Sequence, residues 1–247
     1  MARPKNNNLL PAPNQKHVYV QEMFDAIAPR YDLLNTVLSA SLHHFWRKQT
    51  VRRLGIKQGD TCLDICTGTG DLAFEMGHVC GPTGIVHASD FSEGMLAIAR
   101  IKNATRGAAN ITFAKADAQA LPYESNVYDA STVAFGMRNV ANLDAGIAEL
   151  VRVTKPRGRV AILEFNQPTS AWFRGVYRFY TFKILPLIGG IISGRKSAYA
   201  YLPASVDAWP SREELTRRLS NAGCTSVSCF DFMLGAVALH VGVKNEC

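Results

Sequence analysis

A glycine-rich turn at residues 68–70 contains the residue types best suited to binding a ligand. The apolar run before it, residues 61–67, is typical of a buried strand, and helical apolar spacing follows it. Gly68 and Gly70 carry no Cβ, so a ligand can approach the backbone amides at the start of that helix, next to Thr69. The turn therefore predicts a binding site that uses backbone donors.

Three acidic residues accompany the first three expected strands. Asp64 lies inside the first strand, Asp90 ends the second, and Asp117 lies near the end of the third, where Ala118 follows it. Because the carboxyl ends of parallel strands meet at one edge of a sheet, we expect these side chains near the glycine turn. A carboxylate can accept both hydroxyls of a ribose, and the third acid can accept from an adenine amine. The pattern predicts a nucleoside cofactor.

The glycine turn alone is ambiguous, because with Ala73 it also fits the fingerprint of dinucleotide-binding dehydrogenases. A pyrophosphate site would not explain Asp64 and Asp117, however. The arrangement resembles the class I S-adenosylmethionine-dependent methyltransferases. That resemblance implies S-adenosylmethionine as the cofactor, with the glycine loop beside its methionine and ribose, Asp90 beside the ribose, and Asp117 with Ala118 beside the adenine.

Strands alternate with helices along most of the chain, which predicts a doubly wound, Rossmann-like α/β sheet. The expected parallel strands are residues 61–67, 85–90, 111–118, 128–135 and 159–165. Ser211 and Glu214 form a capping box for a later helix that stops at Gly223. The strands after it, residues 226–232 and 235–243, are too close together for a helical crossover and must pair antiparallel. We expect a seven-stranded, mostly parallel sheet with one antiparallel C-terminal strand.

A chain of 247 residues, 47% of them hydrophobic, suits a single domain. Residues 1–19 are polar and lack the apolar segment of a signal peptide, so we expect a loose tail. Residues 20–247 form the domain, with a helical N-terminal extension at 20–56 and an aromatic insert at 167–209. The apolar run in the insert is shorter than the roughly twenty residues that span a bilayer. The insert is therefore either a core helix or a lid for an oily substrate at a membrane surface.

The net charge is +7, and the basic residues occur in clusters, the first of which contains Arg47, Lys48, Arg52 and Arg53. Such clusters favour anionic partners, either nucleic acid or phospholipid head groups, although a solvated helix face explains the first cluster equally well. The six cysteines show neither zinc-ligand spacing nor a disulfide framework. We expect no metal site and a cytoplasmic protein, peripheral at the inner face of the plasma membrane.

Further motifs resemble the UbiE/MenG/COQ5 family, the C-methyltransferases of menaquinone and ubiquinone synthesis. The N-terminal signature is Tyr31-Asp32-Leu33-Leu34-Asn35, followed at fixed spacing by Leu38, Ser39, His43 and Trp46. The other blocks are Phe135-Gly136-Met137-Arg138-Asn139-Val140, Arg152-Val153-x-Lys155-Pro156-x-Gly158 with Leu163-Glu164-Phe165, and Gly235-Ala236-Val237-Ala238-Leu239-His240-Val241-Gly242. The likeness covers almost the whole chain from about Val20 onward, and it departs from the family pattern at Leu34, Ala134, Arg157 and Asn166.

This resemblance implies methylation of a ring carbon of a polyprenyl hydroquinone, either a naphthoquinol or a benzoquinol. Ionising a ring hydroxyl, whose pKa is about 10, activates that carbon. Arg138 lies just beyond the fourth strand, where ligands of such sheets bind, and is suited to stabilise the phenolate. Arginine cannot itself act as the base. Water, His43, Asp32 or His240 would therefore take the proton.

Tyr31 and Asn35 are four residues apart, so they share one face of the expected helix and are suited to line the acceptor pocket. Several candidates also have a purely structural explanation. Arg138 can pair with an acid such as Asp144, and His240 can be a hydrogen-bonded core histidine.

Three other functions stay open from the sequence. Positive charge favours a nucleic-acid methyltransferase, but residues 135–138 replace the Asn/Asp-Pro-Pro-Tyr type of motif, and we expect no nucleic acid partner. A catalytically silent scaffold in a quinone-synthesis complex would not bind S-adenosylmethionine, and a dehydrogenase would bind NADH. Between the acceptors, Val241-Gly242 resembles the menaquinone-type members and favours a naphthoquinol. The oligomeric state is open, a homodimer being one alternative.

Overall fold

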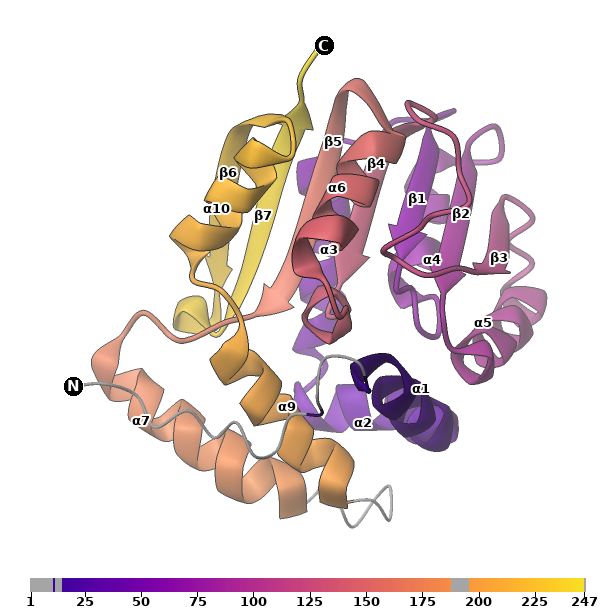
Figure 1. Ribbon diagram of the computed structural model, residues 1–247. Coiled ribbons are helices and arrows are strands. Elements are labelled where there is room, and N and C mark those ends of the chain that lie inside the picture. Colours follow the sequence, from indigo (N-terminus) through magenta and orange to yellow (C-terminus); the bar gives the residue numbers. More distant parts are fainter. Residues whose placement is uncertain (1–10, 12–14, 188–195, 247) are drawn as a thin grey trace.

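The computed structural model describes residues 11, 15–187 and 196–246, whose strands form one seven-stranded sheet (Figure 1). The strand order is β3-β2-β1-β4-β5-β7-β6, and β7 is antiparallel to both of its neighbours. The strands are β1 (Thr61–Ile65), β2 (Ile85–Asp90), β3 (Ile111–Lys115), β4 (Tyr128–Ala134), β5 (Thr154–Phe165), β6 (Cys224–Phe232) and β7 (Val237–Lys244). The predicted, mostly parallel α/β sheet with one antiparallel C-terminal strand is confirmed.

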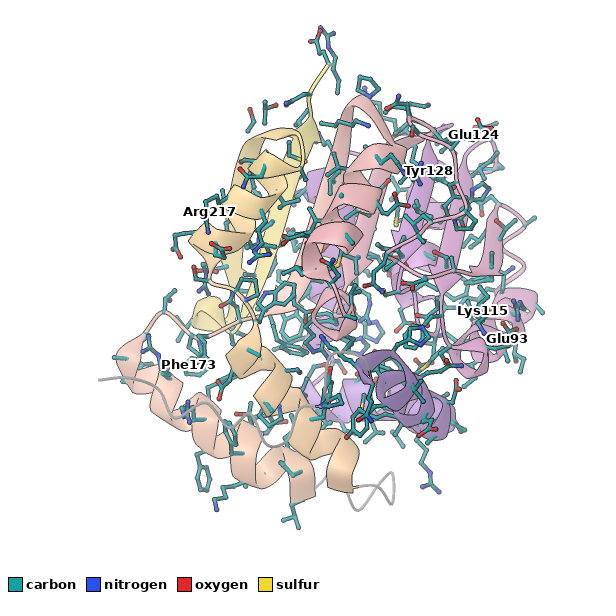
Figure 2. All side chains as sticks on the ribbon, viewed as in Figure 1. Glu93, Lys115, Glu124, Tyr128, Phe173 and Arg217 are labelled. Carbon is teal, nitrogen blue, oxygen red and sulfur yellow. The ribbon has the colours of Figure 1, made fainter. Side chains whose placement is uncertain are left out.

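Helices cover both faces of the sheet, because successive residues of a strand point to opposite sides. Cys62 of β1 packs in the cluster formed with α3 and α4, whereas its neighbour Leu63 packs in the cluster formed with α6 and α10. The helices are α3 (Leu42–Leu54), α4 (Asp71–Cys80), α5 (Glu93–Arg106), α6 (Leu143–Val153) and α10 (Arg212–Asn221). Figure 2 shows side chains filling the space between these helices and the strands. This packing fixes the strand ends that position the site.

Side-chain caps define the starts of several helices. Ser211 accepts a hydrogen bond from the backbone N–H of Glu214 at 3.2 Å, as the capping box predicts. Ser92 caps α5 in the same way by accepting from the backbone N–H of Met95 at 3.1 Å. The helix that follows Asp90 therefore begins at a fixed position beside the end of β2.

Some strand ends differ from the predicted boundaries. β1 ends at Ile65, because Cys66 turns away from the strand with a φ of 53°. β3 ends at Lys115, so Asp117 lies in the loop after the strand rather than on it. β5 begins at Thr154 instead of residue 159 and is irregular at its start, where the pairing with β4 shifts register. Strand ends depend on backbone geometry that apolar patterns do not encode.

The N-terminal extension and the insert fold as helices that lie together at one end of the sheet (Figure 1). The extension contains α1 (Lys16–Ile27) and α2 (Tyr31–Leu38), and the insert contains α7 (Ala171–Phe179), a π-helical turn (Tyr180–Ile184) and α9 (Lys196–Ala208). Lys16 begins α1 inside the predicted loose tail of residues 1–19, most of which lies outside the described residues, as does the apolar run of the insert beyond Leu187. Every helix in the described ranges is too short or too polar to pass through a bilayer.

Replacing Gly84 by alanine should destabilise the fold. An added Cβ would lie 2.7 Å from the carbonyl oxygen of Cys80 and 2.9 Å from that of Asp60, and backbone atoms cannot easily move aside. We expect Gly84→Ala to lower the free energy of unfolding by about 1–3 kcal/mol in a denaturant titration. Gly175→Ala is the control, since nothing lies within 4 Å of its Cβ on α7. Equal stability of the two variants would contradict this close packing.

Candidate active site

The carboxylate of Asp90 holds the glycine turn in place. Its Oδ2 accepts from the backbone N–H of Gly68, and its Oδ1 accepts from that of Ser92, both at 2.9 Å. Gly68 and Gly70 have φ values of 58° and 85°, a region that favours glycine. Asp90 is only 6% exposed, and burial raises its pKa to about 6. Asp90 thus connects the end of β2 to the glycine turn, which follows β1, and to the start of α5, which follows β2.

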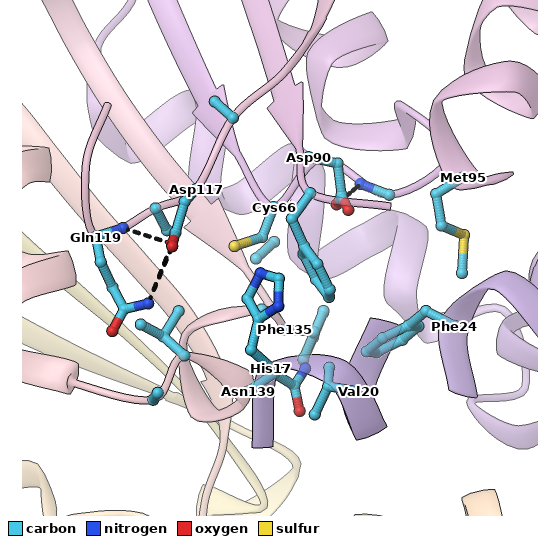
Figure 3. A pocket seen from close by; sticks show the side chains of 18 of the residues that line it. His17, Val20, Phe24, Cys66, Asp90, Met95, Asp117, Gln119, Phe135 and Asn139 are labelled. Carbon is cyan, nitrogen blue, oxygen red and sulfur yellow. Dashed lines mark hydrogen bonds between the residues drawn. The ribbon is translucent and has the colours of Figure 1, made fainter. Parts of the chain in front are cut away.

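A first cavity opens at this turn, beyond the ends of β1, β2 and β4 (Figure 3). Of the residues predicted to bind the cofactor, Gly68, Asp90, Asp117 and Ala118 line it. The carboxylate of Asp117 accepts from the backbone and side-chain nitrogens of Gln119, at 2.9 and 3.1 Å, so its position is fixed. The predicted acceptors for ribose and adenine therefore face one space, which we call the cofactor cavity.

Asp64, Thr69 and Gly70, which were also predicted to bind the cofactor, lie outside the lining of this cavity. Asp64 is 1% exposed beneath the turn, and its Oδ2 accepts from the hydroxyl of Thr67 at 2.6 Å. Burial raises its pKa to about 7. The hydroxyl of Thr69 donates to Asp32 at 2.5 Å. The side chains of Asp64 and Thr69 therefore support the turn from the side away from the cavity. A strand pattern in the sequence does not show whether such a side chain faces the ligand or lies behind the turn.

Helix α1 closes the cofactor cavity, a role that was not predicted for the helical extension that begins at residue 20. His17, Val20 and Phe24 line the cavity, and Figure 3 shows them across from Asp90. Lys16 donates to the carbonyl oxygens of Arg138 and Val140, at 2.9 and 2.8 Å, which fastens the start of the helix. Lys16 and His17, which lie in the predicted loose tail, thus contribute to the site together with the predicted helical extension.

Asn139 is a second residue that the sequence analysis left without a role. It lines the cofactor cavity, and its buried Oδ1 has no hydrogen-bond partner among the described residues. A buried acceptor without a donor costs free energy, and a ligand with an N–H or O–H group can supply that donor. In the sequence, the only indication of a role for Asn139 was its position in the motif of residues 135–140, which follows β4.

A second, larger cavity of about 570 Å³ lies between the N-terminal extension and the insert. Its walls are mainly apolar and aromatic, and the predicted acceptor-site residues Tyr31, Asn35, His43 and Arg138 all line it. We call it the acceptor cavity. It shares Phe24, Tyr31 and Phe135 with the cofactor cavity, and these residues form the boundary between the two spaces.

Arg138 is paired, but not with Asp144. Its Nη1 lies 2.7 Å from Oε1 of Glu164 and 2.5 Å from the carbonyl oxygen of Phe135. Both charged side chains are almost fully buried, whereas Asp144 pairs with Arg218 on the surface. The guanidinium is therefore held rigidly at the acceptor cavity, with much of its charge balanced by Glu164.

Of the three side chains considered as proton acceptors, only His43 lines the acceptor cavity. Its Nδ1 lies 2.5 Å from Nη1 of Arg47, its Nε2 lies 3.3 Å from the hydroxyl of Thr36, and burial lowers its pKa to about 4. Both ring nitrogens are thus occupied. Asp32 and His240 lie outside both cavities, contrary to that hypothesis.

The other two candidates have structural partners instead. Asp32 accepts from Lys102 at 2.8 Å as well as from Thr69, which connects α2 to α5 and to the glycine turn. His240 is a buried residue of β7, and its Nε2 lies 3.1 Å from the carbonyl oxygen of Arg212. His240 is therefore the core histidine that the sequence left as an alternative.

Comparison with known proteins agrees with this geometry. The model of the ubiE/COQ5 methyltransferase family matches residues 12–244. The chain belongs to that family. An enzyme of Pseudomonas putida named ubiquinone/menaquinone biosynthesis C-methyltransferase UbiE is 40% identical over 94% of this chain and 91% of its own length. The protein of that name from Saccharophagus degradans is 41% identical over 91% of each chain.

Solved structures share the fold of this ubiE/COQ5 family member. A SAM dependent methyltransferase from Aquifex aeolicus has a TM-score of 0.59 and 21% identity, covering 80% of this chain and 89% of its own. The cyclase SpnF has a TM-score of 0.65 and 16% identity, covering 96% and 98%. Because such identities show the fold alone, the chemistry has to be argued from the site.

The cofactor cavity suits S-adenosylmethionine, the methyl donor of this C-methyltransferase. Asp90 and Asp117 offer carboxylate oxygens, and Asn139 offers an unpartnered acceptor, for the hydroxyl and amine groups of the nucleoside. Bound there, S-adenosylmethionine supplies an electrophilic methyl group. Within the described residues, no group of three His, Cys, Asp or Glu side chains is arranged to hold a metal ion.

Binding of S-adenosylmethionine should weaken as the pH falls from 7 to 5. Because its pKa is raised to about 6, the carboxylate of Asp90 takes up a proton in this range and loses acceptor capacity. We expect the affinity, measured by calorimetric titration at a series of pH values, to show an inflection near pH 6. Below that pH, the loss of affinity should approach tenfold per pH unit. Asp90→Asn should bind weakly at pH 7 without that inflection. Asp64→Asn is the control and should keep it; an inflection that survives in Asp90→Asn would refute the assignment.

Proposed function

We propose that this enzyme transfers a methyl group from S-adenosylmethionine to a ring carbon of a polyprenyl hydroquinone, and that demethylmenaquinol is its acceptor. The observation that supports this most is the shared boundary of the two cavities, where Phe24, Tyr31 and Phe135 border a nucleoside site on one side and a large apolar space on the other. The relatives named above act in ubiquinone/menaquinone biosynthesis by their names. A naphthoquinol follows from the likeness of Val241-Gly242 to menaquinone-type members.

In this proposal, the acceptor cavity orients the ring and excludes water from it. Aromatic side chains of Trp46, Phe135 and Phe165 lie close together along its wall, with ring centroids 4.6–6.4 Å apart. Such a wall favours a flat, apolar ring system. Holding the ring carbon in line with the methyl group supplies a large part of the rate.

Ionisation of a ring hydroxyl activates the carbon, and the cavity offers groups that assist it. Arg138 stabilises the phenolate by its charge. Tyr31 remains protonated, because burial raises its pKa, and it can donate to a ring oxygen. With both nitrogens of His43 occupied and Asp32 and His240 elsewhere, water is the proton acceptor in this mechanism.

The proposal is tested by incubating the protein with methyl-labelled S-adenosylmethionine and each reduced acceptor, a demethylnaphthoquinol and a benzoquinol, and analysing the products by mass spectrometry. We expect label in a ring carbon of the naphthoquinol. Label only in the benzoquinol would reassign the enzyme to ubiquinone synthesis. Label in neither acceptor, with S-adenosylmethionine bound, would favour a silent scaffold.

Arg138→Ala should retain affinity for S-adenosylmethionine but lose turnover by about 10²–10³, the usual loss when one charge-stabilising donor is removed. Turnover and calorimetric affinity are measured on the same preparation. Because the substitution leaves Glu164 buried without its partner, the double variant Arg138→Met with Glu164→Gln serves as the control for folding. Unchanged turnover in either variant would remove Arg138 from the mechanism.

We further propose that α7 rests on the membrane surface and delivers the prenyl tail to the acceptor cavity. Trp172 and Phe179 on this helix are 71% and 63% exposed, whereas Phe173, Tyr177 and Tyr180 line the cavity. Three cations of the same segment are also exposed: Arg174, Arg178 and Lys183. Aromatic groups beside cations suit an interface of anionic lipids.

Replacing Trp172 and Phe179 together by serine should weaken binding to vesicles that contain anionic phospholipid. Loss of two large apolar groups from the interface should cost at least about tenfold in partitioning, measured by sedimentation. Ile101→Ser on α5 is the matched control, because Ile101 is 68% exposed but lies on another helix. If both variants bind vesicles like the unaltered protein, α7 is not the contact surface.

A further inference from the structure

Arg47 is a buried cation for which the activity described so far gives no role. It lies on α3, is only 7% exposed and lines the acceptor cavity, although its sequence cluster suggested a solvated helix face. Its Nη1 contacts Nδ1 of His43 at 2.5 Å and the carbonyl oxygen of His43 at 3.3 Å. In the described part of the chain, no carboxylate forms an ion pair with it within 4 Å.

The described residues around Arg47 include no carboxylate bonded to it. The charge of Arg47 helps to lower the pKa of Asp71, but Asp71 forms its ion pair with Lys102, at 2.6 Å, and Asp64 is buried beneath the glycine turn. His43 stays neutral, since its pKa is lowered to about 4. Arg138, in the same cavity, has Glu164 as its partner. A buried charge without a directly bonded counter-ion is costly, and an anionic ligand group would reduce that cost.

Arg47 lies close to the boundary between the two cavities, where methyl transfer is proposed to occur. Its guanidinium lies 5.8 Å from the ring centroid of Phe135, a residue that borders both cavities. The carbonyl oxygen of the same Phe135 accepts from Arg138. Two cations therefore approach one aromatic residue at the boundary, and a hydroquinone has two ring oxygens.

We propose that Arg47 binds the ionised oxygen of the acceptor ring and thereby selects aromatic acceptors in their phenolate form. The assignment rests on the proposed function, because it supposes that a hydroxylated ring enters this cavity. The contacts with His43 use one guanidinium nitrogen, Nη1, and leave Nε and Nη2 for the ligand. Arg138, whose charge is largely balanced by Glu164, assists ionisation of the ring as proposed above, and Arg47 supplies the net positive charge that holds the ionised oxygen.

The test uses two probes of similar shape: a dichloronitrophenol, which is a phenolate at neutral pH, and its uncharged methyl ether. Binding is followed by calorimetry and by the visible absorbance of the phenolate. We expect Arg47→Gln to weaken phenolate binding at least tenfold and binding of the ether less than twofold, because only the first ligand needs the charge. Arg47→Lys should retain part of the preference.

Lys48→Gln is the matched control, since Lys48 is the next residue on α3 but is exposed, and it should bind both probes like the unaltered protein. Affinity for S-adenosylmethionine and the circular dichroism spectrum establish that each variant is folded; if Arg47→Gln is not, Arg47→Lys decides by its phenolate-to-ether ratio. Equal weakening of both probes, or no weakening, would overturn the assignment.

These measurements separate the two proposals. If the unaltered protein prefers the phenolate through Arg47 but methylates neither quinol, the proposed function fails and the anion site stands. If it methylates a quinol and Arg47→Gln keeps the same KM, kcat and probe preference, the anion site fails and the proposed function stands.

Discussion

The site depends on one buried carboxylate that holds two backbone segments together. Asp90 ends β2 and accepts from the backbone of Gly68 in one loop and of Ser92 in the next. Charge-assisted hydrogen bonds of this kind are strong, and here they fix the glycine turn relative to the start of α5. The shape of the cofactor cavity follows from this arrangement. Asp90 therefore has a structural role in addition to lining the cofactor cavity.

The two cavities differ in charge in a way that suits methyl transfer from a sulfonium. The cofactor cavity contains the acids Asp90 and Asp117, which complement a cationic ligand. The acceptor cavity contains Arg138 and Arg47, which complement an anionic ring. Because the walls between them are aromatic, little water can screen these charges. The fold thus places opposite electrostatic environments on the two sides of the boundary formed by Phe24, Tyr31 and Phe135.

Much of the fold followed from the sequence, because strand and helix periods and the capping box at Ser211 are local signals. The acids at strand ends were also predictable, since topology alone brings Asp90 and Asp117 to one edge. The direction in which a side chain points could not be predicted in the same way. Asp64 lies buried beneath the turn, and Arg47, although it belongs to a basic cluster, points inward. The role of His17 was missed because the first turn of α1 precedes the apolar pattern that starts at residue 20, and long-range contacts of Lys16 hold that turn in place.

Helix α1 belongs to both cavities at once, through Phe24. It is fastened at its start by Lys16 and near its end by Asp25, which accepts from the hydroxyl of Ser92. A ligand that settles on one side of this helix reduces the freedom left to it, so the second ligand has less ordering to impose. We therefore expect the affinities for methyl donor and acceptor to be thermodynamically linked, so that loss of either ligand weakens binding of the other.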